Sequence, residues 1–392
     1  MVFIFPPKNL KLMVKRAYQI CKKTIMDTSD PNIVFNEQGE SDYYVNFVNN
    51  ILPNWHTDER GYKELMKISA KIKRSKRNKD FDCIIGLSGG LDSSYCAYVA
   101  KEVMGLRPLI FHVDAGWNTQ QAVSNIEKLV DGLNLDLYTE VINWEEMKDL
   151  QVAYFKSQIA NMDDPQDTAF FSSLYKFARK HKINYVLTGG NYSTECCREP
   201  EEWGAYPGID KILVKDIHSR FGKRPLKTFP IVDIFDYKIY YKYVLGMQVF
   251  KPLNYVPYIK EEAEKLLFEK FGWEKFQHKH HESRFTRFYE DFWMPRKFGY
   301  EKRRAHFSSL ILTGQMTREA ALERISKPEL PEEFLLKEFE YVAHKLDLTV
   351  EELQELFNGK NKTFHDYKNK HALIGFGAKA MKVLGLEKRL FR

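Results

Sequence analysis

Short apolar runs alternate with longer stretches of helical spacing through the middle of the chain. The apolar runs have the length of single strands and cover residues 82–87, 107–114, 137–142, 185–190 and 247–253. Helical patterns between and after them cover residues 95–105, 118–133, 144–159, 167–181 and 258–267. Strands that alternate with helices are joined by parallel crossovers. The pattern therefore predicts an α/β fold with a doubly wound, parallel, five-stranded sheet.

The C-terminal part of the chain departs from this alternation. Pro328 and Pro331 mark a break near residue 327, and the pattern beyond it is helical. Thr349, followed three residues later by Glu352, is a capping-box signature for a helix that ends near Gly359. A C-terminal helical extension over residues 327–392 is therefore expected.

Length and composition set outer bounds on the function. The chain has 392 residues, enough for a main domain with additions, and no apolar run of about 18 residues, so no membrane span is expected. Residues 1–7 carry a brief apolar patch cut by two prolines, which is typical of neither a signal peptide nor an anchor. Five cysteines without framework spacing predict a cytoplasmic protein. The net charge of +7 suits an anionic small molecule as well as RNA.

A glycine-rich hexamer, Ser88-Gly89-Gly90-Leu91-Asp92-Ser93, separates the first apolar run from the first helical pattern. Such a turn binds anions because free backbone N–H groups and the positive end of the helix dipole meet there. The chain has neither the lysine of a Walker A loop nor the G-x-G-x-x-G of a Rossmann turn. The alternative is a turn in which Ser88 or Asp92 only caps the helix. The full hexamer in a strand–turn–helix frame favours a nucleotide phosphate site.

The hexamer resembles the pyrophosphate loop of the PP-loop ATPases, which include asparagine synthetase, GMP synthetase, NAD synthetase and tRNA-thiolating enzymes. Members cleave ATP between the α and β phosphates and adenylylate a carbonyl oxygen. The resemblance implies a PP-loop, adenine nucleotide α-hydrolase-like fold that uses ATP and Mg²⁺. It implies that Ser88, Gly89, Gly90 and Ser93 hold the pyrophosphate and that Asp92 carries the metal ion.

Three predicted strand ends should meet at one rim of the sheet, because ligands of doubly wound sheets bind at the carboxyl ends of the strands. They are the hexamer, the end of the second strand at Val113 and the end of the fourth at Gly189. In PP-loop enzymes the adenine and ribose lie against the corresponding strand ends. The resemblance therefore implies backbone contacts from Leu87, Val113 and Gly189 to the nucleoside.

Three further stretches narrow the resemblance. They begin at Cys21, at Lys279 and at Arg296, and the third runs on through Thr313-Gly314-Gln315. In order and spacing they resemble the N-acetyl sugar amidotransferases of bacterial surface polysaccharide (O-antigen) synthesis, the WbpG type, from about Cys21 to Ala320. That resemblance implies conversion of the acetamido group of a nucleotide sugar to an acetamidino group, with ammonia displacing AMP. It also implies a separate glutaminase pair, resembling the subunits of imidazole glycerol phosphate synthase, as the ammonia source.

The N-terminal knuckle departs from this family. The family pattern there is a pair of C-x-x-C motifs, which form a four-thiolate zinc site. Here Cys21 is kept, whereas Thr24, Ser41 and Tyr44 take the other positions. A single thiolate cannot hold structural zinc, so we expect no structural zinc and a knuckle held by hydrogen bonds and apolar packing. The adjacent pair Cys196-Cys197 is poorly placed to chelate one metal and is interpreted as part of a loop.

A run of basic residues is the first remaining candidate for chemistry. It places five positive charges within nine residues: Arg296, Lys297, Lys302, Arg303 and Arg304. Such a run is commonly a solvated face. Cations aimed at developing negative charge are a large catalytic contribution, however, so some of the five should face the site, and Arg303 is the catalytic candidate.

Histidines precede this run. His280, His281 and Glu282 could relay a proton from the incoming ammonia, with His281 as the catalytic candidate, and an exposed helix end is the alternative. A second basic stretch, residues 215–227, is interpreted as a mobile lid over the site.

The predicted organisation has four parts: an extension with the degenerate knuckle over 1–75, an ATPase domain over 76–270, a basic substrate-binding segment over 271–326 and the helical appendage over 327–392. The leading function is the amidotransferase. The alternative is a PP-loop tRNA-modifying enzyme of the thiolation type, against which Cys83 and Cys96 weigh because both look like core residues. A nucleic-acid partner is therefore not expected. A non-enzymatic nucleotide-binding subunit is the third class.

Overall fold

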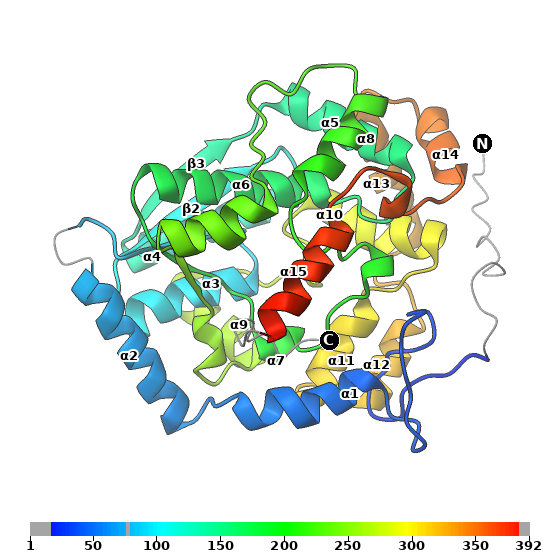
Figure 1. The fold of residues 1–392 in the computed structure, drawn as a ribbon. Coiled ribbons are helices and arrows are strands. Elements are labelled where there is room, and N and C mark those ends of the chain that lie inside the picture. Colours follow the sequence, from blue (N-terminus) through cyan, green and yellow to red (C-terminus); the bar gives the residue numbers. More distant parts are fainter. Residues whose placement is uncertain (1–16, 76–78, 384–392) are drawn as a thin grey trace.

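The computed structural model describes residues 17–75 and 79–383 (Figure 1). The apolar patch at residues 1–7 lies outside the described residues. Within the described ranges, no helix is long and apolar enough to cross a membrane. One five-stranded sheet has the order β3-β2-β1-β4-β5, and each neighbouring pair is parallel. Its strands are β1 (Cys83–Gly86), β2 (Pro108–Asp114), β3 (Asp136–Val141), β4 (Tyr185–Leu187) and β5 (Gln248–Phe250).

The helices fall where the sequence pattern predicts them and continue beyond the sheet. Those around the sheet are α2 (Glu59–Ser75), α3 (Leu91–Tyr98), α4 (Gln120–Leu133), α5 (Trp144–Ser157), α6 (Asp164–Lys180), α8 (Lys211–Phe221) and α9 (Lys260–Phe271). The others are α1 (Asp42–Asn46), α7 (Tyr192–Glu195), α10 (Arg284–Phe288), α11 (Arg303–Leu312), α12 (Arg318–Ile325), α13 (Glu332–Lys345), α14 (Val350–Asn358) and α15 (His371–Val383). The doubly wound α/β class is confirmed.

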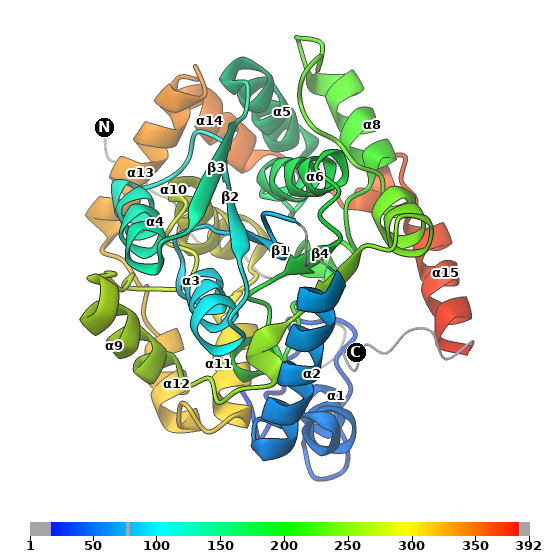
Figure 2. The same ribbon diagram turned by 90° about the vertical axis from the view of Figure 1, so that its left-hand side faces the viewer.

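Helices cover both faces of the sheet (Figure 2), and an apolar core lies on each side of it. Successive strand residues point to opposite faces. Ile84 and Phe111 therefore pack with α5, α6 and the C-terminal helices, while Ile85 and Ile110 pack with α2, α3, α4 and α9. Burial on both faces explains why these strands read as nearly continuous apolar runs.

The strand order reverses at β1, the central strand. β2 and β3 lie on one side of it, and β4 and β5 lie on the other. In open α/β sheets such a switch point opens a crevice outside the carboxyl ends of the strands. The hexamer follows β1 directly, so the topology places it in this crevice.

The N-terminal knuckle packs on α11 and α12, far along the chain (Figure 1). The Arg318 guanidinium donates hydrogen bonds to the carbonyl oxygens of Cys21 and Thr24. The Cys21 sulfur accepts a hydrogen bond from the Ser41 backbone N–H at 3.2 Å. Burial alone would raise the pKa of Cys21, but hydrogen bonds from Ser41 and Thr24 outweigh it and lower that pKa. Hydrogen bonds and the apolar contacts of Ile25 hold this segment together.

The C-terminal helices pack onto the core. The Arg284 and Arg287 guanidiniums both bind the buried Glu338 carboxylate of α13. The predicted capping box at Thr349 and Glu352 is confirmed, since both of its hydrogen bonds are present. The Lys297 ammonium, only 5% exposed, donates to the carbonyl oxygens of Leu356, Phe357 and Gly359.

The basic stretch 215–227 does not form a lid, contrary to the prediction. Its helix α8 packs against α5. The backbone N–H groups of Lys223 and Arg224 donate to the Asp149 carboxylate, and those of residues 227–229 donate to Glu146. Acidic side chains of α5 fix the stretch to the side of the molecule.

Lys297→Met should lower the free energy of unfolding by about 2 kcal/mol or more, because it leaves carbonyl oxygens at the end of α14 without their charged donor. Thermal and urea denaturation measure the loss, and ATP affinity should not change. The matched control is Lys337→Met, which removes an exposed lysine paired with Glu333 and should leave the free energy of unfolding nearly unchanged. Equal stability of the two variants would contradict a structural role for Lys297.

Candidate functional site

The hexamer forms a tight turn between β1 and α3. Gly89 has a φ of +83°, and a Cβ built on it would lie 2.5 Å from the Ala122 carbonyl oxygen, so the turn requires glycine there. Gly90 is the N-cap of α3. The Ser93 hydroxyl accepts from the Ser88 backbone N–H at 3.3 Å and donates to the Gly90 carbonyl oxygen at 3.2 Å. The loop is therefore held in one shape by its own serines.

The predicted rim is present at the carboxyl ends of β1, β2 and β4. Leu87 and Val113 line a common cavity beside the loop. A Cβ on Gly189 would lie 2.5 Å from the Asp92 carbonyl oxygen, so only glycine lets β4 approach α3 this closely. The buried His112 ring contacts the Leu87 carbonyl oxygen at 2.8 Å and the Asn118 amide nitrogen at 2.9 Å. His112 thus fixes the strand end that faces the cavity.

The Glu282 carboxylate lies over the loop. Its Oε1 accepts a hydrogen bond from the Ser88 hydroxyl at 3.2 Å. A Cβ on Gly90 would lie 2.6 Å from the same oxygen. The loop and the N-terminus of α3 therefore hold an anion supplied by the chain itself, which is the chemistry expected of a phosphate site.

Asp92 is surrounded by hydrogen-bond donors. Its carboxylate accepts from the Tyr258 hydroxyl and from the Asn191 amide, and Lys279 lies 3.5 Å from Oδ2. Lys279 also pairs with Glu195 at 2.7 Å. Burial alone would lower the pKa of Lys279, but Glu195 and Asp92 outweigh it and raise that pKa, so the lysine is charged.

The donor set at the loop fits a magnesium ion held mainly by a nucleotide. Asp92 offers carboxylate oxygens, and Mg²⁺ in phosphate sites is held by one or two carboxylates together with phosphate oxygens and water. Across residues 17–75 and 79–383, no group of three or more Cys, His, Asp or Glu side chains could hold a metal ion. Asp92 is thus the side chain at the loop that would hold Mg²⁺, which neutralises phosphate charge when bound.

Two cavities of about 680 Å³ each share a wall, and one of them opens beside the loop. The loop cavity contains the ends of β1 and β2 and a wall of α6, with these lining residues among others: Leu87, Ser88, Val113, Asp163, Phe170 and Tyr175. The second cavity lies toward the knuckle and α11, with these among others: Glu195, Lys260, Lys279, Arg303, His306 and Arg324. Eight residues line both, including Glu199, His280, Glu290 and Lys302.

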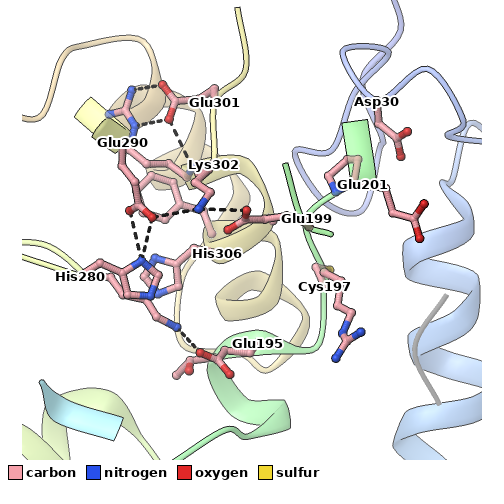
Figure 3. A pocket seen from close by; sticks show the side chains of 18 of the residues that line it. Asp30, Glu195, Cys197, Glu199, Glu201, His280, Glu290, Glu301, Lys302 and His306 are labelled. Carbon is pink, nitrogen blue, oxygen red and sulfur yellow. Dashed lines mark hydrogen bonds and ion pairs between the residues drawn. The ribbon is translucent and has the colours of Figure 1, made fainter. Parts of the chain in front are cut away.

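The shared wall contains a half-buried charge cluster, which we call the junction cluster: Glu199, His280, Glu290 and Lys302 (Figure 3). The Lys302 ammonium lies 3.1 Å from Glu199 and 3.1 Å from Glu290. The His280 ring lies 3.0 Å from Glu290. Burial alone would lower the pKa of His280, but Glu290 outweighs it and raises that pKa to about 9. Both bases are therefore cationic at neutral pH and lie between the two cavities.

His280 also carries backbone strain. Its φ of +63° lies in the left-handed region that residues with a side chain rarely adopt. Such a conformation costs on the order of 1 kcal/mol, and it persists where the surrounding structure enforces it, commonly at functional sites. The strained residue is one of the eight that line both cavities.

Comparison with known proteins assigns the C-terminal stretch of the chain to a described domain family. Residues 282–381 match the family model described as LPS biosynthesis protein WbpG-like, C-terminal domain. This stretch is therefore a WbpG-like C-terminal domain, and the comparisons support placing the chain among the PP-loop proteins. The matched stretch begins at Glu282, the residue over the loop, and runs across the predicted boundary at residue 327 into α15.

Curated relatives match over parts of their length. One subunit of a glutamine-hydrolyzing GMP synthase from Methanosarcina barkeri is 30% identical over 126 residues, which are 31% of this chain and 38% of that protein. The tRNA-specific 2-thiouridylase MnmA 2 from Fusobacterium nucleatum is 25% identical over 210 residues, 49% of this chain and 57% of that protein. The chain thus spans less than two thirds of these relatives. Among solved structures, NMN synthetase from Francisella tularensis matches at 16% identity with a TM-score of 0.36, covering 74% of this chain and 96% of that chain.

Two residues predicted to be catalytic, Arg303 of the WbpG-like domain and His281 just before it, lie in different surroundings. Arg303 lines the second cavity, but its guanidinium already binds Glu301 and Glu329. His281 is buried against Asp291 at 3.0 Å and lines neither cavity. Of the adjacent histidines, His280 is the one in the shared wall. The catalytic roles of Arg303 and His281 stay predictions.

The other members of the basic run have structural partners. Arg296 binds Glu332, Lys297 binds the end of α14, and Arg304 binds the Ile25 carbonyl oxygen and Asp27. Lys302 alone of the five lines both cavities. Lys302 and Arg303 are the members of the run that line a cavity, and the interpretation that they face the site stays a prediction.

Sequence reasoning missed several residues of the site. Glu199, Glu290 and Tyr258 stand in ordinary polar or aromatic surroundings in the sequence, and no spacing marks them. Lys279 and His306 lie within the stretches that carry the family resemblance, which was the available signal. Cys196 and Cys197 are buried at the end of α7, against Ser309 of α11.

Glu282→Gln should tighten the binding of inorganic pyrophosphate about five-fold. The variant removes a negative charge from an anion site, and the repulsion between that charge and the ligand costs about 1 kcal/mol. Calorimetric titration without divalent metal measures this, so that metal coordination does not enter. Glu127→Gln, on the exposed side of α4, is the matched control and should bind as the wild type does. Weaker binding in Glu282→Gln would contradict competition between the carboxylate and the ligand.

ATP affinity should fall as the pH rises from about 6 to about 8. Burial raises the pKa of Asp163, in the loop cavity, to about 7. Asp163 is therefore neutral below that pH and negative above it, where it repels an anionic ligand. Asp163→Asn should have a flatter affinity profile than the wild type in fluorescence titrations at each pH, since the ionisation of ATP itself is common to both. Parallel profiles would contradict the assignment.

Proposed function

We propose that this protein is an ATP-dependent amidotransferase that converts the acetamido group of a nucleotide-activated sugar to an acetamidino group. Its reaction forms AMP and serves bacterial surface polysaccharide (O-antigen) synthesis in the cytoplasm. The observation that carries the proposal is the shared wall between a cavity that Ser88 of the hexamer lines and a second cavity to which the WbpG-like domain contributes Lys302 and His306.

The loop cavity suits ATP. The nucleoside would lie against Leu87, Val113 and the rim near Gly189, and the pyrophosphate would lie on Ser88, Gly89, Gly90 and Ser93. Asp92 would hold Mg²⁺ among the phosphate oxygens. This orientation directs the α-phosphate toward the wall that contains His280 and Lys302.

The second cavity suits the sugar. The acetamido oxygen would reach the α-phosphate at the junction cluster. There the cations His280 and Lys302 would stabilise the negative charge that develops on the phosphate and the oxygen. Attack of this oxygen on the α-phosphate releases pyrophosphate. Ammonia then adds to the activated carbon, and the carbon–oxygen bond breaks to release AMP. No protein nucleophile is required.

Ammonia would come from a separate glutaminase pair. The Methanosarcina barkeri relative is named as one subunit of a glutamine-hydrolyzing synthase, and that name implies an enzyme divided between chains. The likeness supports a synthetase chain that receives nitrogen from a partner.

The alternative is a PP-loop tRNA-modifying enzyme, favoured by the likeness to a tRNA-specific 2-thiouridylase. All five cysteines are buried, and none lies on the loop. Burial raises the pKa of Cys83 and of Cys96 above the usual range. Neither thiol is available for sulfur transfer, which weighs against this alternative.

Incubation with ATP, Mg²⁺, ammonium and a UDP-acetamido sugar should release AMP and give a sugar product one mass unit lighter, because NH replaces O. Chromatography and mass spectrometry measure the two products. AMP release that depends on tRNA and is independent of the sugar would overturn the proposal.

Asp92→Asn should abolish AMP formation, with a fall of at least about 100-fold, because the amide is a poor ligand for Mg²⁺ at the phosphates. Circular dichroism should show an unchanged fold. Asp131→Asn, an exposed aspartate of α4, is the control and should turn over as the wild type does. Unchanged turnover of Asp92→Asn would refute the metal role.

A further inference from the structure

His306 differs from the other histidines around the second cavity. His278 pairs with Glu329 at 2.7 Å, His280 with Glu290 at 3.0 Å and His281 with Asp291 at 3.0 Å. The His306 ring, which lines the cavity from α11, makes no hydrogen bond or ion pair with the described residues. Its ring nitrogens are therefore available to a molecule in the cavity.

Cationic side chains of three other segments lie close enough to act electrostatically on this ring. They are Lys260 of α9, Lys279 and His280 of the segment before α10, and Arg324 of α12. Burial and then these four charges lower the pKa of His306 well below the usual range. His306 is thus a neutral imidazole that projects into the cavity beside the junction cluster (Figure 3).

The proposed reaction leaves one proton to be removed. When ammonia adds to the activated carbon, the new C–N bond uses the nitrogen lone pair and the added nitrogen becomes positively charged. Loss of a proton from that nitrogen supplies the electron density that expels AMP. The carbon–oxygen bond then breaks, its electron pair leaves with AMP, and an amidinium remains. A base near the second cavity must accept this proton.

The groups of the junction cluster cannot accept it readily. His280 is already cationic, because its pKa is raised to about 9 beside Glu290. The Glu199 and Glu290 carboxylates are both paired with Lys302, and pairing with His280 and Lys302 outweighs burial and lowers the pKa of Glu290. Beside these charged groups, His306 is the neutral side chain with a vacant lone pair.

We propose that His306 is the catalytic base that takes the proton from the nitrogen entering the acetamidino group. This inference rests on the proposed amidotransferase function and assigns a step within it. The surrounding cations have a second consequence: phosphate groups of the bound substrates offset their charge, so the imidazole becomes a better base once the site is filled.

The test separates activation of the amide from transfer of nitrogen. His306→Gln should retain exchange of labelled pyrophosphate into ATP that depends on the acceptor sugar, which also shows that the variant is folded. It should lose amidine formation from ammonia by at least about 100-fold. Added imidazole should restore part of that rate, and the remaining rate should rise with pH. His344→Gln, an exposed histidine of α13, is the control and should match the wild type in both assays.

The possible failures are distinguishable. A wild-type protein that makes no amidine and exchanges no pyrophosphate with an acetamido sugar would overturn the proposed function. A wild-type protein that makes amidine, together with an equally active His306→Gln, would overturn the base assignment alone. Loss of exchange and transfer to the same extent in His306→Gln, without rescue by imidazole, would also overturn it in favour of a role in binding.

Discussion

The Lys302 ammonium is a charge held inside the protein, and the site is arranged around it. A buried charge is stable only when paired and hydrogen-bonded. Its partners, Glu199 and Glu290, come from the segment after α7 and from the π-helical segment Tyr289–Phe298. Because Glu290 also binds His280, the same pairing fixes a strained residue close to the loop. The parallel sheet alone would supply a phosphate site. The pairing of Lys302 joins that site to a second cavity, which the proposed reaction would need for its acceptor.

The fold and the loop could be predicted from the sequence because their signals are local. A strand buried on both faces reads as an apolar run. The tight turn at Gly89 requires glycine, because its φ is positive and a Cβ there would meet the Ala122 carbonyl oxygen. The capping box at Thr349 and Glu352 is local in the same way. The junction cluster could not be predicted, since Lys302 and Glu199 meet only through tertiary packing. His306 is the clearest case, because its lowered pKa comes from burial and from four cations on three other segments.

The basic run shows how a single sequence feature divides in three dimensions. Lys297 caps α14 and Arg304 holds the knuckle, so both stabilise the fold, while Lys302 lies in the shared wall.

The knuckle is held by residues that lie far along the chain. The Arg318 guanidinium donates a hydrogen bond to the Cys21 carbonyl oxygen, and the Ser308 hydroxyl accepts one from the Ile25 N–H. At this segment the family pattern has thiolates around a metal. The knuckle therefore depends on α11 and α12, and residues of the same two helices line the second cavity.

The central claim is that an acceptor amide in the second cavity meets the α-phosphate of ATP at the junction cluster. The most direct measurement uses an acceptor sugar whose acetamido oxygen is oxygen-18, turned over with ATP and ammonia and followed by mass spectrometry of the nucleotide. We expect the label to appear in AMP, since the oxygen attacks the α-phosphate and leaves with it. Label that stays in the sugar or appears in pyrophosphate, with AMP unlabelled, would contradict the claim.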